Sequence, residues 1–171
     1  AQAQIVQVVA VVPGAMQECN GQPFCQPVRL PSRAYRGSGT IVAAGASQYK
    51  PGKSLVLTAS HVLEGATQFS VCDYPARLLG HEQRDSDDGM PVTDLAMLEV
   101  DHDFAEMGDG YSLDISDSES IVGQTANAVG YNRTSAKGVW GVVKTQQTIL
   151  APIQQGDSGG PIVYDGRVCG V

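Results

Sequence analysis

The 171-residue chain has little positive charge and no long apolar segment. It holds 11 Lys and Arg against 18 Asp and Glu, a formal net charge of −7, so it lacks the clustered cations that bind a nucleic-acid backbone. Spanning a bilayer takes roughly 20 apolar residues, whereas the best run, Ile5–Val12, is interrupted by Gln7 and ends at Pro13. We therefore expect neither a nucleic-acid partner nor membrane insertion.

Groups that bind metals are also scarce. His81 and His102 have no cysteine or histidine partner at the spacing of a metal site. The acidic residues Asp85, Asp87 and Asp88 lack the twelve-residue ligand pattern and the terminal Glu of a calcium loop. We interpret the acidic stretch as a solvated loop and expect no metal and no organic cofactor.

The four cysteines fall into two kinds of context. Cys19 and Cys25 flank the turn-rich stretch Asn20–Phe24, which can bring their thiols together, so we predict a disulfide between them. Cys72 and Cys169 lie in apolar, strand-like contexts and are interpreted as small buried hydrophobic residues. One disulfide with two unbridged thiols favours a secreted or periplasmic protein, although a reducing compartment stays open.

Glycine (20 residues) and proline (9 residues) are plentiful, and long segments with a helical period are absent. Short segments rich in Val, Ile, Leu and Thr recur between turn residues, which is typical of an all-β barrel or sandwich. Two polar stretches interrupt this pattern: Glu82–Pro91 is predicted to be a surface loop and Met107–Ser120 a linker between two lobes. The apolar segments are Ile5–Val12, Gly39–Ala43, Ser54–Ala59, Gln68–Cys72, Ala76–His81, Leu95–Val100, Thr125–Tyr131, Gly138–Lys144, Pro161–Val163 and Arg167–Val171.

The hexapeptide Gly156–Pro161 places Ser158 among glycines. Peptide hydrolysis near neutral pH needs a nucleophile, a base and donors for the developing oxyanion. Glycines allow a tight turn that points backbone amides inward. We therefore predict Ser158 as the nucleophile and the amides of Gly156 and Ser158 as the oxyanion hole. The alternative for this stretch alone is a glycine-rich hairpin turn.

Two further segments supply the partners that a serine nucleophile needs. The apolar strand from Leu57 ends in small residues just before His61. Asp94 stands directly before the apolar segment Leu95–Val100. A histidine can take the serine proton, and a buried carboxylate can hold the imidazole in the required tautomer. Each residue alone also fits a structural role. Their order, histidine, then aspartate, then serine, favours a catalytic triad.

These three motifs resemble the histidine, aspartate and serine boxes of trypsin-like serine peptidases, closest to the compact Deg/HtrA-like branch of bacteria or viruses. Gly37–Ile41 resembles the glycine-rich strand that opens the first barrel of that family. The resemblance implies an all-β fold, a double antiparallel β-barrel of chymotrypsin type with six strands in each barrel and the triad between them. Further matching segments are Leu113–Ser118, Val122–Gln124, Ala128–Tyr131 and Gly166–Val171.

The expected organisation is a single peptidase domain over residues 1–171, with lobe one at about 1–105, a linker at about 106–120 and lobe two at about 121–171. Three departures from the family pattern stand out. The N-terminal Ile-Val-Gly-Gly sequence is absent, so Asp157 needs another partner or stays solvated. Val62 stands where a cysteine-containing stretch is common. The last strand ends at Val171 and is interpreted as incomplete. Either the sequence is truncated, or the protein completes its barrel in another way.

Motifs and resemblance together predict a serine endopeptidase that acts on polypeptides through an acyl-enzyme. Two alternatives stay open, namely a catalytically silent peptide-binding or structural module, and a single-turnover autoprocessing domain of a polyprotein. For the location, the alternative to a secreted or periplasmic protein is a viral polyprotein product. The oligomeric state is left open. In this family the residues just before the serine motif form the base of the specificity pocket, and here they are Pro152, Ile153, Gln154 and Gln155. A preference for Lys or Arg would need a carboxylate at that base, but no acid lies between Thr145 and Gln155. The pocket should therefore favour cleavage after small or medium apolar residues.

Overall fold

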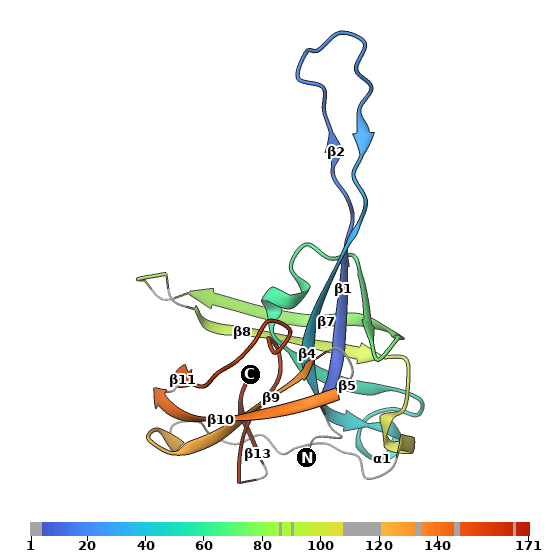
Figure 1. Ribbon diagram of the computed structural model, residues 1–171. Coiled ribbons are helices and arrows are strands. Elements are labelled where there is room, and N and C mark those ends of the chain that lie inside the picture. Colours follow the sequence, from blue (N-terminus) through green and yellow to red (C-terminus); the bar gives the residue numbers. More distant parts are fainter. Residues whose placement is uncertain are drawn as a thin grey trace.

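The computed structural model describes residues 5–85, 87–89, 91–107, 121–132, 135–145, 148–165 and 167–171. These residues form a closed barrel, a five-stranded sheet and a two-stranded arm (Figure 1). The helical elements that lie wholly within them are three single turns, α1 (Gly45–Gln48), η2 (Ser60–Leu63) and η3 (Phe104–Met107). No helix in the described ranges is long and apolar enough to cross a membrane. The predicted all-β fold is confirmed.

Six antiparallel strands close the first barrel in the order β1-β4-β5-β8-β7-β6. Successive side chains of a strand point to opposite faces, and every second residue fills the barrel interior. Val8, Val56, Leu98 and Val100 are fully buried there. The strands are β1 (Ile5–Val12), β4 (Arg33–Ala44), β5 (Ser54–Thr58), β6 (Gln68–Val71), β7 (Tyr74–Asp85) and β8 (Pro91–Val100).

Strand β7 is longer than its sequence pattern indicates. It pairs with β8 as far as Arg84 opposite Thr93 and Asp85 opposite Pro91. The predicted surface loop Glu82–Pro91 is therefore wrong for its first four residues and for Pro91, which are strand. Both faces of β7 are exposed from Leu79 onward, so no alternation of apolar and polar residues marks this end in the sequence.

The second lobe contains an antiparallel sheet in the order β11-β10-β9-β12-β13. Ile121, Ala126, Val143 and Cys169 form its buried core; Cys169 is buried as expected, whereas Cys72 of the first lobe is only partly so. Five strands of this lobe lie within the described residues, against the six expected by resemblance. The strands are β9 (Thr125–Asn132), β10 (Ser135–Thr145), β11 (Thr148–Leu150), β12 (Ile162–Tyr164) and β13 (Arg167–Gly170).

All barrel strands lie before residue 101 and all strands of the second sheet after residue 124. The proposed lobe boundaries stay a prediction. Most of the predicted linker, residues 108–120 with the segment Leu113–Ser118, lies outside the described residues, as does Gly166.

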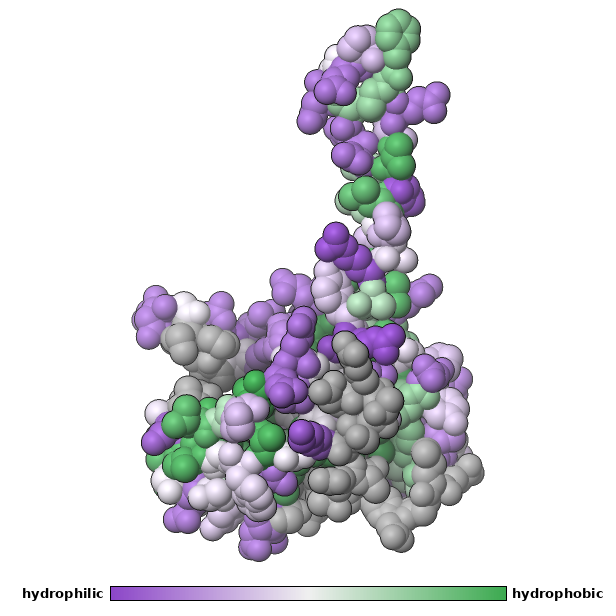
Figure 2. Space-filling model, viewed as in Figure 1, coloured by the Kyte–Doolittle hydropathy of each residue, from purple (hydrophilic) through white to green (hydrophobic). Residues whose placement is uncertain are grey.

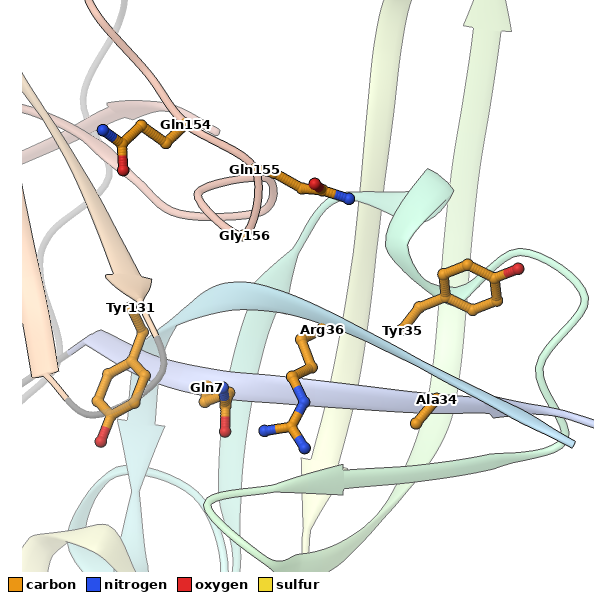
Figure 3. Close-up of a pocket in the computed structure, with 8 residues that line it drawn as sticks. All are labelled: Gln7, Ala34, Tyr35, Arg36, Tyr131, Gln154, Gln155 and Gly156. Atoms are coloured by element: carbon orange, nitrogen blue, oxygen red, sulfur yellow. The ribbon is translucent and has the colours of Figure 1, made fainter.

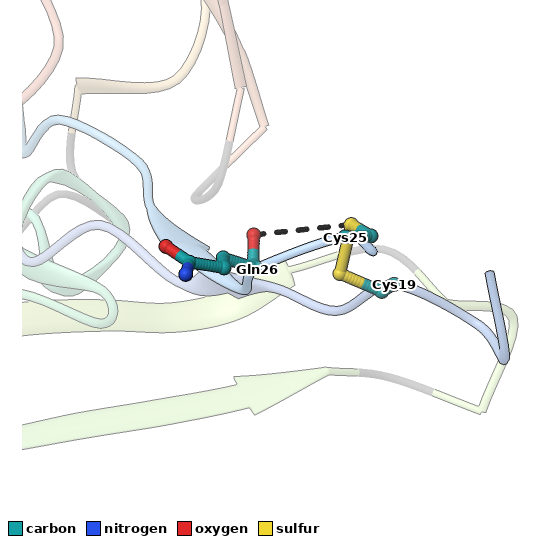
Figure 4. Close-up of a disulfide and its surroundings, with 3 residues drawn as sticks. All are labelled: Cys19, Cys25 and Gln26. Carbon is teal, nitrogen blue, oxygen red and sulfur yellow. Dashed lines mark hydrogen bonds between the residues drawn. A yellow bond between two sulfur atoms is a disulfide. The ribbon is translucent and has the colours of Figure 1, made fainter. Parts of the chain in front are cut away.

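Between β1 and β4 the chain leaves the barrel as an arm that contains β2 (Met16–Gln17) and β3 (Val28–Arg29). The arm stands away from the body of the protein (Figures 1 and 2). Near its tip a disulfide joins Cys19 to Cys25, whose Cα atoms lie 5.8 Å apart (Figure 4). The side chain of Phe24 is fully exposed. The arm therefore depends on its own strand pairing and disulfide for its shape.

Glu99 of β8 carries a charge in a nearly covered position, with its side chain only 7% exposed. Its carboxylate accepts hydrogen bonds from the Tyr49 hydroxyl, from Arg77 Nε at 3.1 Å and from Lys50 Nζ at 3.3 Å. These partners, first Tyr49 and then Arg77, lower the pKa of Glu99 from 4.5 to about 2. The contacts tie β8 to β7 and to the segment that follows α1.

This network predicts a loss of stability in acid. Because the folded state lowers the pKa of Glu99, the unfolded chain binds more protons between about pH 4.5 and pH 2. The free energy of unfolding should therefore fall as the pH drops through that window. Glu99→Gln should lower the denaturant midpoint at pH 7 and flatten its fall in acid. The control Glu64→Gln removes the same charge from an exposed site, and an equal effect there would contradict the prediction.

Candidate active site

The register between β5 and β8 brings His61 and Asp94 together. Strand β5 ends at Thr58, and the chain then turns into η2, which carries His61. Thr58 pairs with Ala96 of the antiparallel strand β8. Asp94 lies two residues before Ala96, so β8 extends past the end of β5 at the place where η2 begins.

The carboxylate of Asp94 contacts His61 twice. Its Oδ1 accepts a hydrogen bond from the backbone N–H of His61 at 2.9 Å, and its Oδ2 lies 2.5 Å from the ring Nδ1. The Asp94 side chain is 23% exposed and that of His61 48%. A carboxylate at Nδ1 favours the tautomer with its proton on that atom, which leaves Nε2 as an acceptor.

Ser158 lies in the turn between β11 and β12, and its side chain is exposed. Together with His61 and Asp94 it lines one hollow of about 530 Å³ between the barrel and the second sheet. No hydrogen bond joins its hydroxyl to His61 within the described residues. Such bonds are often long or poorly aligned until a substrate is bound. The three predicted residues thus share one cavity, and two of them are in direct contact.

The serine turn is held tightly against the first barrel. The backbone N–H of Ser38 donates to the carbonyl of Ser158 at 2.7 Å, and Ser38 Oγ donates to the carbonyl of Gly156 at 2.8 Å. Gly159 has a φ of +88°, and a Cβ at this position would lie 2.2 Å from the carbonyl oxygen of Ser38. The glycine after the serine is therefore required both by backbone conformation and by close packing.

The amides predicted to form the oxyanion hole have no competing acceptor. Within the described residues, neither the N–H of Gly156 nor that of Ser158 donates a hydrogen bond, whereas Ser38 contacts both carbonyls. Gly156 has a φ of +99°, a conformation that glycine adopts without strain. Both N–H groups thus lack a partner among the described residues, but only Ser158 lines the cavity with His61 and Asp94, whereas Gly156 lines a second hollow on the other side of the turn.

Asp157 finds its partner inside the turn. Its Oδ2 accepts the backbone N–H of Gln154 at 2.8 Å. Its Oδ1 packs so closely on β9 that a Cβ at Gly130 would lie 2.1 Å away. Asp157 is therefore held by its own loop.

The four residues predicted for the specificity pocket do not lie together. Ile153 and Gln154 line the hollow that holds Ser158. Gln154 and Gln155 line a second hollow on the other side of the turn, and Pro152 lines neither. The apolar wall of the first hollow comes instead from residues that the sequence did not single out, namely Ile121, Val129, Val143, Ile149 and Ile162.

Residues 37–171 match the family model described as trypsin-like peptidase domain. The match covers more than half of the chain, so the protein belongs to the trypsin-like peptidase domain family. Its function is accordingly of the serine-peptidase type, and such a domain implies polypeptide substrates. No curated protein matches the sequence.

Proposed function

We propose that the protein is a serine endopeptidase with Ser158 as nucleophile, His61 as general base and then acid, and Asp94 as the group that orients His61. The observation that carries the proposal is the double contact of Asp94 with His61 at the cavity that Ser158 also lines. The carboxylate is bound to both the backbone and the ring of the histidine. It therefore fixes the position of the base as well as its tautomer.

The chemistry follows from these positions. Ser158 Oγ attacks the carbonyl carbon of the scissile bond while His61 Nε2 takes the hydroxyl proton. The negative charge that develops on the carbonyl oxygen is stabilised by the N–H groups of Gly156 and Ser158, each typically worth about 3 kcal/mol. His61 then gives the proton to the leaving amine, and the acyl-enzyme remains. Water activated by His61 hydrolyses that ester and restores Ser158.

The hollow beside Ser158 supports a preference for apolar residues before the scissile bond. Ile153 is 58% exposed and lines this hollow, and the wall beside it is largely apolar. Two carboxylates line the hollow, but Asp94 is bound to His61 and Asp157 to the backbone N–H of Gln154. A Lys or Arg side chain would have to compete with these partners, and a charge stripped of water without a counter-ion costs several kcal/mol. Cleavage after Val, Ala, Ile or Leu is the preference that these residues support.

We also propose that the chain belongs to the compact Deg/HtrA-like branch, on the basis of its Gly37–Ile41 motif and of Ile153 at the base of the pocket. A secreted or periplasmic location is supported by the disulfide between Cys19 and Cys25, since such bonds persist in oxidising compartments.

A peptide library tests this function and its specificity together. We expect most cleavage after small or medium apolar residues, accompanied by labelling of Ser158 with a fluorophosphonate probe. Dominant cleavage after Lys, Arg, Asp or Glu would contradict the proposed pocket while leaving the peptidase intact. Absence of both cleavage and labelling would favour a catalytically silent module. Cleavage confined to the protein's own chain would favour autoprocessing.

A further inference from the structure

A second hollow, of about 670 Å³, lies on the other side of the serine turn. Gln154, Gln155 and Gly156 line one part of it, and Arg36 of β4 and Tyr131 of β9 another (Figure 3). Gln154 borders both hollows. Gly156 supplies one of the proposed oxyanion donors, so the two hollows meet close to the place where a scissile carbonyl would lie.

Arg36 lies on β4 close in sequence to Ser38, the residue that contacts the serine turn. Residues two apart in a strand point to the same face, and Arg36 lies two residues before Ser38. The hydroxyl of Ser38 donates to Gly156 and accepts the backbone N–H of Tyr131 at 2.6 Å. Arg36 therefore leaves β4 on the same face as Ser38, two residues or roughly 7 Å along the strand. In Figure 3 its guanidinium points away from Gln155 and Gly156, toward Gln7, which lines the same hollow.

Arg36 is also the one charged side chain among the residues that line this hollow. Its other lining residues are neutral, and no carboxylate of the described residues is within ion-pair distance of its guanidinium. In a protein of net charge −7, this is a local cation without a counter-ion in the part of the chain that the structure describes. A guanidinium binds a carboxylate with two parallel hydrogen bonds, so the hollow is suited to an acidic side chain.

We propose that this hollow receives the substrate residues that follow the scissile bond, and that Arg36 selects an acidic side chain among the first two of them. The inference rests on the proposed peptidase function. The hollow with Ile153 takes the side chain before the scissile bond, and a peptide extended across Ser158 then leaves past Gly156. The part of the peptide that follows the scissile bond, on the leaving-group side, enters the second hollow. Arg36 is thus a specificity-determining residue that does not take part in the bond-breaking steps.

The test compares matched peptides that carry Glu or its neutral isostere Gln at each of the two positions after the scissile bond. Wild-type protein should cleave the better Glu peptide with a kcat/KM about fivefold above its Gln partner, the size expected for a solvent-accessible ion pair. The ratio should shrink at high salt, because salt screens accessible charges. Arg36→Gln should bring the ratio to about one, and Arg36→Glu should make a Lys peptide the preferred substrate.

Arg33→Gln is the matched control. Arg33 is an exposed residue of the same strand that does not line the hollow, and three residues from Arg36 it points to the opposite face. This variant should keep both the activity and the Glu preference of the wild type. If peptides are cleaved but the wild-type ratio is one, or if Arg36→Gln leaves the ratio unchanged, the assignment of Arg36 is wrong while the peptidase function stands.

Binding measured without turnover separates the two proposals further. Fluorescence anisotropy with Ser158→Ala should show the Glu peptide bound about fivefold more tightly than the Gln peptide, and the difference should vanish when Arg36→Gln is added. If no peptide is cleaved by the wild type, this measurement still decides: retained discrimination supports the acid-selecting hollow, and equal affinities overturn it.

Discussion

Ser158→Ala is expected to lower kcat/KM by at least about a thousandfold, and by up to about 10⁶-fold, because loss of the nucleophile removes the covalent pathway. The fold should persist. The serine side chain is exposed, so its loss leaves no cavity in a core, and the contact from Ser38 N–H to the carbonyl of residue 158 involves only backbone atoms. Steady-state kinetics and a thermal unfolding curve for the same preparation measure both expectations.

An exposed serine elsewhere provides the control for this substitution. Ser47 of α1 is exposed, and Ser47→Ala should leave both kcat/KM and the unfolding midpoint unchanged. The Ser158 variant should also lose its reaction with a fluorophosphonate probe. Retention of more than about a thousandth of the wild-type activity would mean that another group is the nucleophile, since loss of a triad serine costs far more.

The sequence is most informative where function depends on short segments. The glycines around Ser158, the small residues before His61 and the apolar strand after Asp94 are local signals, and their order along the chain adds to them. The structure adds the strand pairing that brings these separate segments into contact. The contact of Asp94 with His61 follows from the pairing of Thr58 with Ala96, and a strand register cannot be read from either motif alone.

Features built from distant segments leave little trace in the sequence. The hydrogen bond from Ser38 to Gly156 joins residues 118 positions apart, and the hollow lined by Arg36 and Gly156 lies beside this contact. An arginine before a glycine-rich strand looks like any exposed cation. In the same way, the requirement for Gly159 comes from the carbonyl of Ser38, whereas the motif indicates only that a tight turn is present.

The polar end of β7 shows a different limit. Glu82–Asp85 reads as a loop because strand prediction relies on one buried face. This segment is held instead by its backbone pairing with β8, as at Gln83 opposite Asp94. The pairing extends β7 alongside the part of β8 that carries the candidate catalytic aspartate. A segment without apolar residues thus helps to position the site.

Asp94→Asn is expected to lower kcat by about 10⁴-fold at neutral pH, although asparagine has nearly the same shape. Oδ1 of residue 94 must accept the backbone N–H of His61, while the second atom of the side chain faces the ring Nδ1. In asparagine the carbonyl oxygen should keep the backbone contact, so the amide nitrogen is placed against Nδ1 and donates to it. The ring must then carry its proton on Nε2, where it cannot accept the proton of Ser158.

Nitrogen NMR of the His61 ring should accordingly show the Nδ1–H tautomer in the wild type and the Nε2–H tautomer in Asp94→Asn. Asp73→Asn makes the same change of charge at an exposed turn residue with a φ of +69°, a conformation that asparagine tolerates, and it should leave kcat unchanged. A variant at position 94 with kcat within tenfold of the wild type would show that Asp94 does not set the tautomer of the base. An unchanged tautomer together with the full loss of activity would instead mean that the carboxylate acts through its charge, by stabilising the imidazolium as it forms.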